Sequence, residues 1–136
     1  MSLSILLELP DDQAEVLDRI AAGMSRSPRE AMAVLMNEAL QHEQFPQIEF
    51  RDSPCGRQAY IVGSSLAAWE LIMIAEGYDL QSTLVATHMD WPQSRVEGVI
   101  RYYRAHPHEI DRAIAENDAI TPAQMKQALP GSIWTV

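Results

Sequence analysis

Residues 1–30 read MSLSILLELPDDQAEVLDRIAAGMSRSPRE, and this stretch predicts a short strand followed by two helices. Apolar side chains alternate with other residues over positions 2–9, and a period of two indicates a strand with one apolar face. Pro10 ends that strand because proline cannot donate to a strand ladder. Helical spacing of apolar residues then predicts a helix from Asp11 to Ala22 that stops at Gly23.

The second helix has a clear start signal. Ser27 is expected to cap it, because Pro28 stands at its first position and Glu30 at its third. Apolar residues then cover more than half of its circumference, so the helix needs a partner surface. The strand over residues 2–9 lacks a neighbour as well. A second copy would supply both, which predicts a homodimer. The residues expected at this contact are Leu3, Ile5, Leu7, Val34 and Leu35.

The order strand, helix, helix, with SRSPRE between the helices, resembles the ribbon-helix-helix (CopG/Arc-like) repressors and antitoxins. The resemblance implies that paired strands enter the DNA major groove and that the second helix binds a phosphate at its amino end. The family's groove-facing positions, where forked donors and acceptors are usual, correspond here to Ser2, Ser4 and Leu6, with Glu8 as a further candidate. A dimerisation unit without base reading is therefore the alternative. The residues expected to hold phosphate are Arg26, Ser27 and Arg29.

A different pattern begins near residue 46. Ile48–Phe50 and Ala59–Val62 are short strand candidates, and the loop RDSPCGRQ between them is rich in turn formers, which predicts a β-hairpin. An apolar helix is expected over Leu66–Ala75, capped by Ser64 or Ser65. The residues expected on its inward face are Leu66, Trp69, Ile72 and Met73.

Two further helices are predicted over about Leu80–Thr87 and Pro92–Ala105, with Asp79 and Asp90 as their caps. Two helices joined by a tight turn are typical of a helix-turn-helix domain. Their expected inward residues are Leu80, Leu84, Val85, Val96, Val99, Ile100 and Tyr103. The residues expected to face DNA are Gln93, Ser94, Arg95, Arg101 and Arg104. The alternative is a solvated face on which Arg101 or Arg104 pairs with Glu97.

Residues 61–117 contain four short motifs, I-x-G at Ile61–Gly63, E-G-Y at Glu76–Tyr78, Y-Y at Tyr102–Tyr103 and H-P-x-E-I-D at His106–Asp111. With these motifs in this order, the segment resembles the DUF433 domain. The resemblance implies a homeodomain-like trihelical fold and a role as antitoxin, or DNA-binding partner, of a PIN-like RNase. The chain departs from the family at two places: Gly63–Leu66 lacks the arginine of the usual G-T-R motif, and Thr87–Trp91 replaces the usual Y-P-x-L-T turn.

Charge and composition narrow the possible functions. The 136 residues hold 10 Lys and Arg against 19 Asp and Glu, a net charge of −9, which excludes a globally basic surface. DNA contact must therefore come from a local patch. The single cysteine, Cys55, cannot form an internal disulfide and indicates a reducing cytoplasm. No membrane span, signal peptide or small-molecule substrate is expected.

Few residues suggest enzymatic chemistry. Cys55 lies in a predicted loop with no histidine that the sequence places beside it. His106 and His108 stand two apart without a cluster of further ligands. His106 and Glu109 are expected to cap a helix over Glu109–Glu116 instead. The sequence therefore predicts a protein that is not an enzyme and has no metal or cofactor.

The predicted fold class is mainly α with short strands. A ribbon-helix-helix dimerisation unit is expected over residues 1–45, a DUF433-like helix-turn-helix domain with a hairpin over 46–118, and a C-terminal helix and tail over 119–136. The predicted function is a cytoplasmic, homodimeric DNA-binding regulator, the antitoxin of a type II pair that represses its own operon and masks a PIN-like RNase. The alternative is a protein–protein assembly module without DNA binding. The tail residues expected to bind a partner, or to pack on the chain itself, are Ile133, Trp134 and Val136.

Overall fold

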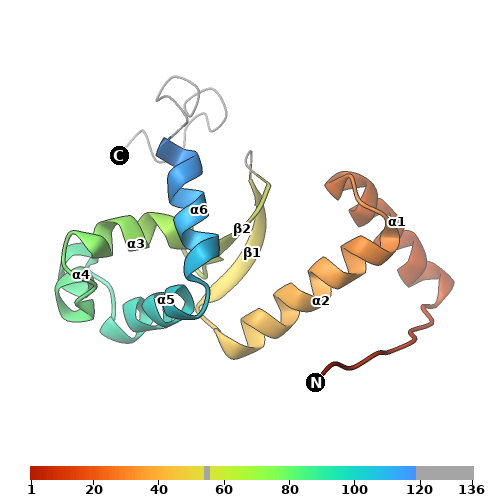
Figure 1. Ribbon diagram of the computed structural model, residues 1–136, viewed down its shortest axis with the longest axis horizontal. Helices are drawn as coiled ribbons and strands as arrows, with labels where there is room; N and C mark the ends of the chain where they lie inside the picture. The colour runs from red at the N-terminus through yellow and green to blue at the C-terminus, as the bar shows by residue number, and fades with distance from the viewer. Residues whose placement is uncertain (54–55, 119–136) are drawn as a thin grey trace. The chain divides into compact units, whose positions relative to one another are not determined.

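The computed structural model describes residues 1–53 and 56–118, which form six helices and one two-stranded antiparallel hairpin (Figure 1). The mainly helical class with short strands is therefore confirmed. The chain forms two compact units, Met1–Leu40 and Gln41–Val136. Among the helices in the described ranges, none has the length and apolar content that crossing a bilayer requires.

In the first unit, helix α1 covers Asp11–Met24 and begins directly after Pro10. It passes through Gly23, where we expected it to stop, and ends at Ser25 with a φ of 56°. The Ser25 and Arg26 N–H groups donate to carbonyls of the last turn at 3.1 and 3.0 Å. A left-handed residue with such hydrogen bonds closes a helix, so Ser25 provides the stop that the sequence assigned to glycine.

Helix α2 covers Pro28–Gln44 and starts as predicted. Ser27 Oγ accepts a hydrogen bond from Glu30 N–H at 3.1 Å, and Glu30 Oε1 accepts one from Ser27 N–H at 3.1 Å. This reciprocal pair satisfies two amide donors that the first turn would otherwise leave open.

Residues 1–10 form neither helix nor strand, so the strand predicted over 2–9 is absent from the single chain. A strand needs a ladder partner, and the described part of the chain supplies none for this segment.

In the second unit, β1 (Ile48–Ser53) pairs antiparallel with β2 (Gly56–Ile61), and the register runs from Ile48 opposite Ile61 to Ser53 opposite Gly56. The predicted hairpin is confirmed, with longer strands. At the end of β2, Ile61 N–H donates to Leu66 O at 2.9 Å. This contact ties the segment before the next helix to the sheet.

Helix α3 covers Ala68–Glu76. The predicted serine cap is wrong: Ser64 Oγ accepts from Leu66 N–H, whereas Glu70 Oε1 accepts from Ala67 N–H at the start of the helix. Glu70 closes the first turn because it lies at the third helical position. The inward face is also rotated, since Met73 is exposed. The fully covered residues of α3 are Ala68, Leu71, Ile72 and Ala75.

Helices α4 (Ser82–Met89) and α5 (Gln93–Ala105) follow, each starting later than predicted. Asp79 is not a cap, because it adopts a φ of 54° in the connection before α4. Asp90 ends α4 in the left-handed conformation and does not cap α5. The short polar side chain of aspartate tolerates that conformation.

The inward faces of these two helices are only partly as predicted. Leu84 is exposed, and Ala86 is buried beside Val85. On α5, Tyr102 is fully buried while Tyr103 is only half-buried. The predicted residues Val96, Val99 and Ile100 are buried.

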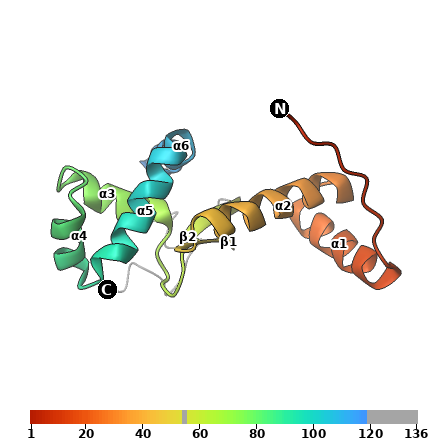
Figure 2. The same cartoon turned by 90° about the horizontal axis from the view of Figure 1, so that it is seen from below.

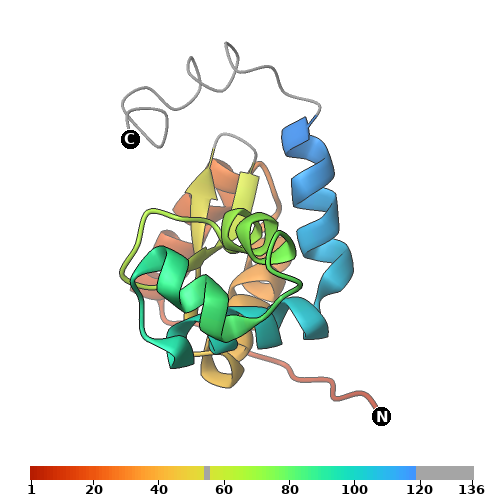
Figure 3. The same cartoon turned by 90° about the vertical axis from the view of Figure 1, so that its left-hand side faces the viewer.

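Helix α6 covers Pro107–Asp118 and packs against α3 and α5, as Figures 2 and 3 allow the reader to follow. Its Ile110 joins the core of the second unit. The largest fully buried side chains of that core are Tyr102, Ile48, Ile61, Leu71, Ile72, Val85, Val96 and Val99.

Candidate nucleic-acid interface

Helix α5 presents a polar face to solvent beside α4, against which it packs. Three residues join the two helices. The helical repeat places Ser94, Glu97, Arg101 and Arg104 along one side of α5. All four are exposed. The structure thus brings together part of the predicted DNA-binding set and adds a carboxylate to it.

Arg95 does not belong to that exposed face. Its Nη2 donates to Val62 O at 2.6 Å, and its guanidinium lies 4.0 Å from the ring centroid of Trp91. Gly63, whose φ is +78°, leaves room for it, since a Cβ there would lie 3.3 Å from Arg95 Nη2. The guanidinium therefore joins α5 to the end of the hairpin and is already engaged.

Gln93 is engaged in a different way. Its Nε2 donates to Glu97 Oε1 at 2.9 Å and to Ser82 Oγ at 3.1 Å. Ser82 Oγ in turn donates to Glu97 Oε1 at 3.4 Å. Gln93 and Glu97 are exposed and Ser82 is half-buried, and together they connect the first residue of α4 to the first turns of α5. Sequence reasoning missed Ser82, because its contact partners stand 11 and 15 positions away.

Arg101 and Arg104 line a hollow of about 340 Å³ beside the start of α4, together with Leu80, Ser82 and Ile100. Glu97 borders the same hollow. Within the described ranges, neither guanidinium forms an ion pair. Arg101 also lies 5.7 Å from the ring centroid of Phe45, at the outer range of a cation–π contact. Two unneutralised cations in a concave surface favour an anion.

The amino end of α2 holds the remaining predicted phosphate ligands, Arg26, Ser27 and Arg29, all exposed. Glu30 shares this position, and the hydrogen bond from Ser27 N–H lowers the pKa of its carboxyl. A charged carboxylate on a helix amino end satisfies the same donors that a phosphate would use. The anion site predicted here is therefore partly occupied by the chain's own side chain.

The predicted dimer residues differ in their exposure. The side chains of Leu3, Ile5 and Leu7 are 83%, 74% and 56% exposed, whereas Val34 and Leu35 on α2 are half-buried. A mostly apolar groove of about 630 Å³ is lined by Ser4, Ile5, Leu6, Leu7, Leu9, Leu17, Pro28, Arg29 and Met32. Apolar surface of this extent is typical of a protein contact.

Helix α6 begins at Pro107, two residues earlier than predicted, so His106 directly precedes it, and His106 O accepts a hydrogen bond from Ile110 N–H at 3.4 Å. The side chains of His106 and Glu109, which were expected to cap the helix, bind other partners. Glu109 accepts a hydrogen bond from the buried Tyr102 hydroxyl, and His106 Nε2 lies 2.8 Å from Gln41 Oε1. These contacts fasten the end of α5 to its neighbours. No group of three His, Cys, Asp or Glu residues in the described ranges is arranged to hold a metal ion.

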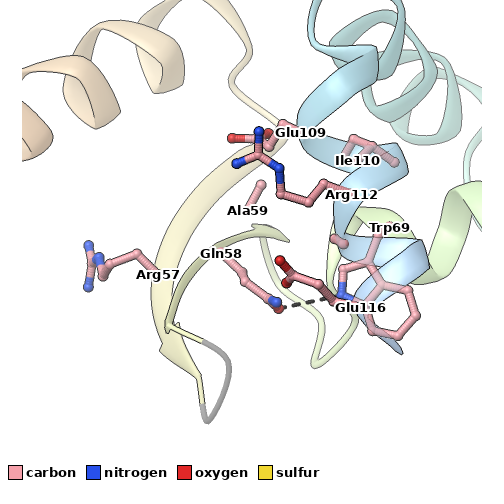
Figure 4. Close-up of a pocket in the computed structure, with 9 residues that line it drawn as sticks. Arg57, Gln58, Ala59, Trp69, Glu109, Ile110, Arg112 and Glu116 are labelled. Carbon is pink, nitrogen blue, oxygen red and sulfur yellow. Dashed lines mark hydrogen bonds between the residues drawn. The ribbon is translucent and has the colours of Figure 1, made fainter. Parts of the chain in front are cut away.

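A second hollow, of about 300 Å³, lies between β2, α3 and α6 (Figure 4). Trp69 Nε1 donates to Gln58 Oε1 at 3.4 Å on its wall. Arg57 and Arg112 contribute positive charge, and Glu109 and Glu116 contribute negative charge. The hollow therefore favours neither an anionic nor a cationic ligand. Sequence reasoning did not find this hollow, because its walls come from three separate elements.

The predicted partner-binding residues Ile133, Trp134 and Val136 lie outside the described residues, as does Cys55. Comparison of the chain with family models, with curated proteins and with solved structures finds no match.

Proposed function

We propose that this chain is a homodimeric DNA-binding transcriptional regulator that contacts the DNA backbone through α5. The observation that carries the proposal is the state of Arg101 and Arg104: both are exposed on one side of α5, and neither has an ion-pair partner among the described residues. Unpaired guanidinium groups on a helix that follows a tight turn are suited to phosphate contact. In an acidic chain, they form a local basic patch.

The antitoxin role rests on resemblance. The DUF433-like motifs of residues 61–117 and the ribbon-helix-helix order of the first unit both favour a regulator that represses its own operon and masks a PIN-like RNase. Exposed Leu3 and Ile5 support the dimer, because leaving such side chains in water is unfavourable.

The test is fluorescence anisotropy with labelled duplex DNA from upstream of the chain's own operon, measured at several salt concentrations. Each phosphate-contacting arginine that is removed should lower the salt slope by about one. The double variant Arg101→Ala, Arg104→Ala should therefore have a salt slope smaller in magnitude than that of wild type by about two. The control is Arg112→Ala, since Arg112 is also an exposed arginine but lies on α6. Equal binding by the double variant and the wild type would contradict the proposal.

A second candidate is an assembly module without DNA binding. The carboxylates of Glu97 and Glu30 beside the two candidate phosphate sites favour it, because each repels a phosphate. This candidate predicts that the purified chain forms a dimer, and co-purifies with the product of the neighbouring gene, while DNA anisotropy stays flat at low salt. A salt-dependent DNA complex would exclude it.

A further inference from the structure

Glu97 and Arg101 stand four positions apart on α5, with the acid on the amino-terminal side. This spacing and order are the ones that favour an ion pair along a helix. The described structure contains no ion pair between them. The Glu97 carboxylate is held instead by Gln93, one turn earlier, at 2.9 Å, and by Ser82 of α4 at 3.4 Å.

The position of Glu97 has a consequence for the hollow beside α4. An arginine paired with a carboxylate offers a neutral surface, whereas an unpaired one keeps its charge for a ligand. The amino end of α4, eight residues long, adds a partial positive charge at Ser82 on the same wall. Arg101 and Arg104 provide the full charges.

We propose that the hydrogen bonds from Gln93 and Ser82 hold Glu97 away from Arg101, and so keep the Arg101 guanidinium open for a phosphate group. Gln93 and Ser82 are positioning residues that act through Glu97. The ligand is a phosphate, either of a nucleic-acid backbone or free in solution. The inference rests on the proposed function only where the phosphate belongs to a nucleic-acid backbone.

The test is a double-mutant cycle on the full chain. Gln93→Ala removes the closest restraint, so Glu97 can pair with Arg101 and compete with the phosphate. An exposed pair of this spacing has a strength that corresponds to about a twofold change in affinity. Duplex DNA should therefore bind Gln93→Ala about twofold more weakly than wild type. In a Glu97→Gln background the same substitution should have no effect, because a neutral amide cannot form the ion pair.

Gln44→Ala is the matched control, since Gln44 is an exposed glutamine at the end of α2 and belongs to none of these contacts. It should bind DNA as wild type does. A loss in Gln93→Ala that persists in the Glu97→Gln background would mean that Gln93 contacts DNA itself, and would overturn the inference. Equal binding by wild type and Gln93→Ala would also overturn it, while leaving the proposed function intact.

A second measurement separates the two sources of phosphate. Inorganic phosphate is titrated into the labelled protein, and the NMR signal of the Arg101 Nε–H group is followed. The Arg101 signal should shift when phosphate is added to wild type, and it should shift less in Gln93→Ala. The single variant Glu97→Gln and the double variant Gln93→Ala, Glu97→Gln should show the same shift as each other. If the wild type binds no DNA, the proposed function fails, and this titration alone decides the inference. Absence of any shift in wild type overturns it.

Discussion

A methyl group on Gly98 would lie 2.6 Å from Cγ of Gln47 and 3.2 Å from its Cβ. Gly98 is buried in the middle of α5, and Gln47 immediately precedes β1. Gln47 cannot move freely because its carbonyl accepts a hydrogen bond from Val62 N–H at 2.9 Å. The close approach of α5 to the hairpin thus depends on the absence of a side chain at position 98.

Gly98→Ala should therefore destabilise the second unit by about 1–3 kcal/mol, because overlap in a packed contact outweighs the gain in helix propensity. Urea unfolding followed by circular dichroism measures the change. Gly23→Ala is the control: its added Cβ meets nothing within 4 Å, so the same substitution in α1 should stabilise the first unit by about 1 kcal/mol. A stabilised Gly98→Ala variant would show that the contact is loose.

Arg95 should affect stability more than DNA binding. Arg95→Ala removes the hydrogen bond to Val62 O and the stacking on Trp91, and should lower the free energy of unfolding by about 1–2 kcal/mol. Arg95→Lys should recover little, because an ammonium group does not reproduce planar stacking. The exposed Arg104→Ala should leave stability within about 0.5 kcal/mol of wild type. A reduced salt slope in folded Arg95→Ala would count against this assignment.

The pH dependence of stability should report on Glu70. Burial raises the pKa of Glu70 above its ordinary value of 4.5, although the hydrogen bond from Ala67 N–H opposes the rise. The native state then holds more protons than the unfolded state between the two pKa values, so this group's contribution to stability falls as the pH rises through that window. Glu70→Gln keeps an acceptor for Ala67 N–H and cannot ionise.

The stability of Glu70→Gln relative to wild type should therefore improve between pH 4 and pH 7, as urea unfolding at each pH will measure. The contribution of Glu30 to stability changes with pH in the opposite direction. Its pKa is lowered, so its contribution is present above about pH 4.5 and is lost as the pH falls through the folded-state value. If the free energy of unfolding of Glu70→Gln fell relative to wild type as the pH rose, this result would contradict the raised pKa.

The proposed dimer predicts a difference between neighbouring positions. Leu3, Ile5 and Leu7 would point into the dimer from one side of a paired strand, while Leu6 would point out. Ile5→Asp should therefore dissociate the dimer, whereas Leu6→Asp should keep it, as light scattering at tens of micromolar will show. A monomeric wild type at that concentration, or an equal effect of both variants, would rule out this arrangement.

The sequence by itself determined the elements whose signals are local. The Ser27 to Glu30 pair predicted the start of α2, and two short strand candidates on either side of a turn-rich loop predicted the hairpin. The capping pair lies within four positions, so the backbone responds to it before any tertiary contact forms. The two strands of the hairpin are neighbours in the sequence, so the turn formers between them are enough to indicate their pairing. Helix ends were less predictable, because a left-handed residue such as Ser25 or Asp90 closes a helix without glycine.

Only the tertiary structure decided which polar residues of α5 are free. Arg95 meets Val62 across 33 positions, and Gln93 meets Ser82 across 11. The sequence pattern of α5 predicted the same DNA-facing role for Arg95 and Arg101, since both are arginines on a helix that follows a turn. Their environments differ because the hairpin and α4 pack against different sides of α5. The local sequence of α5 does not show which side each of those elements covers.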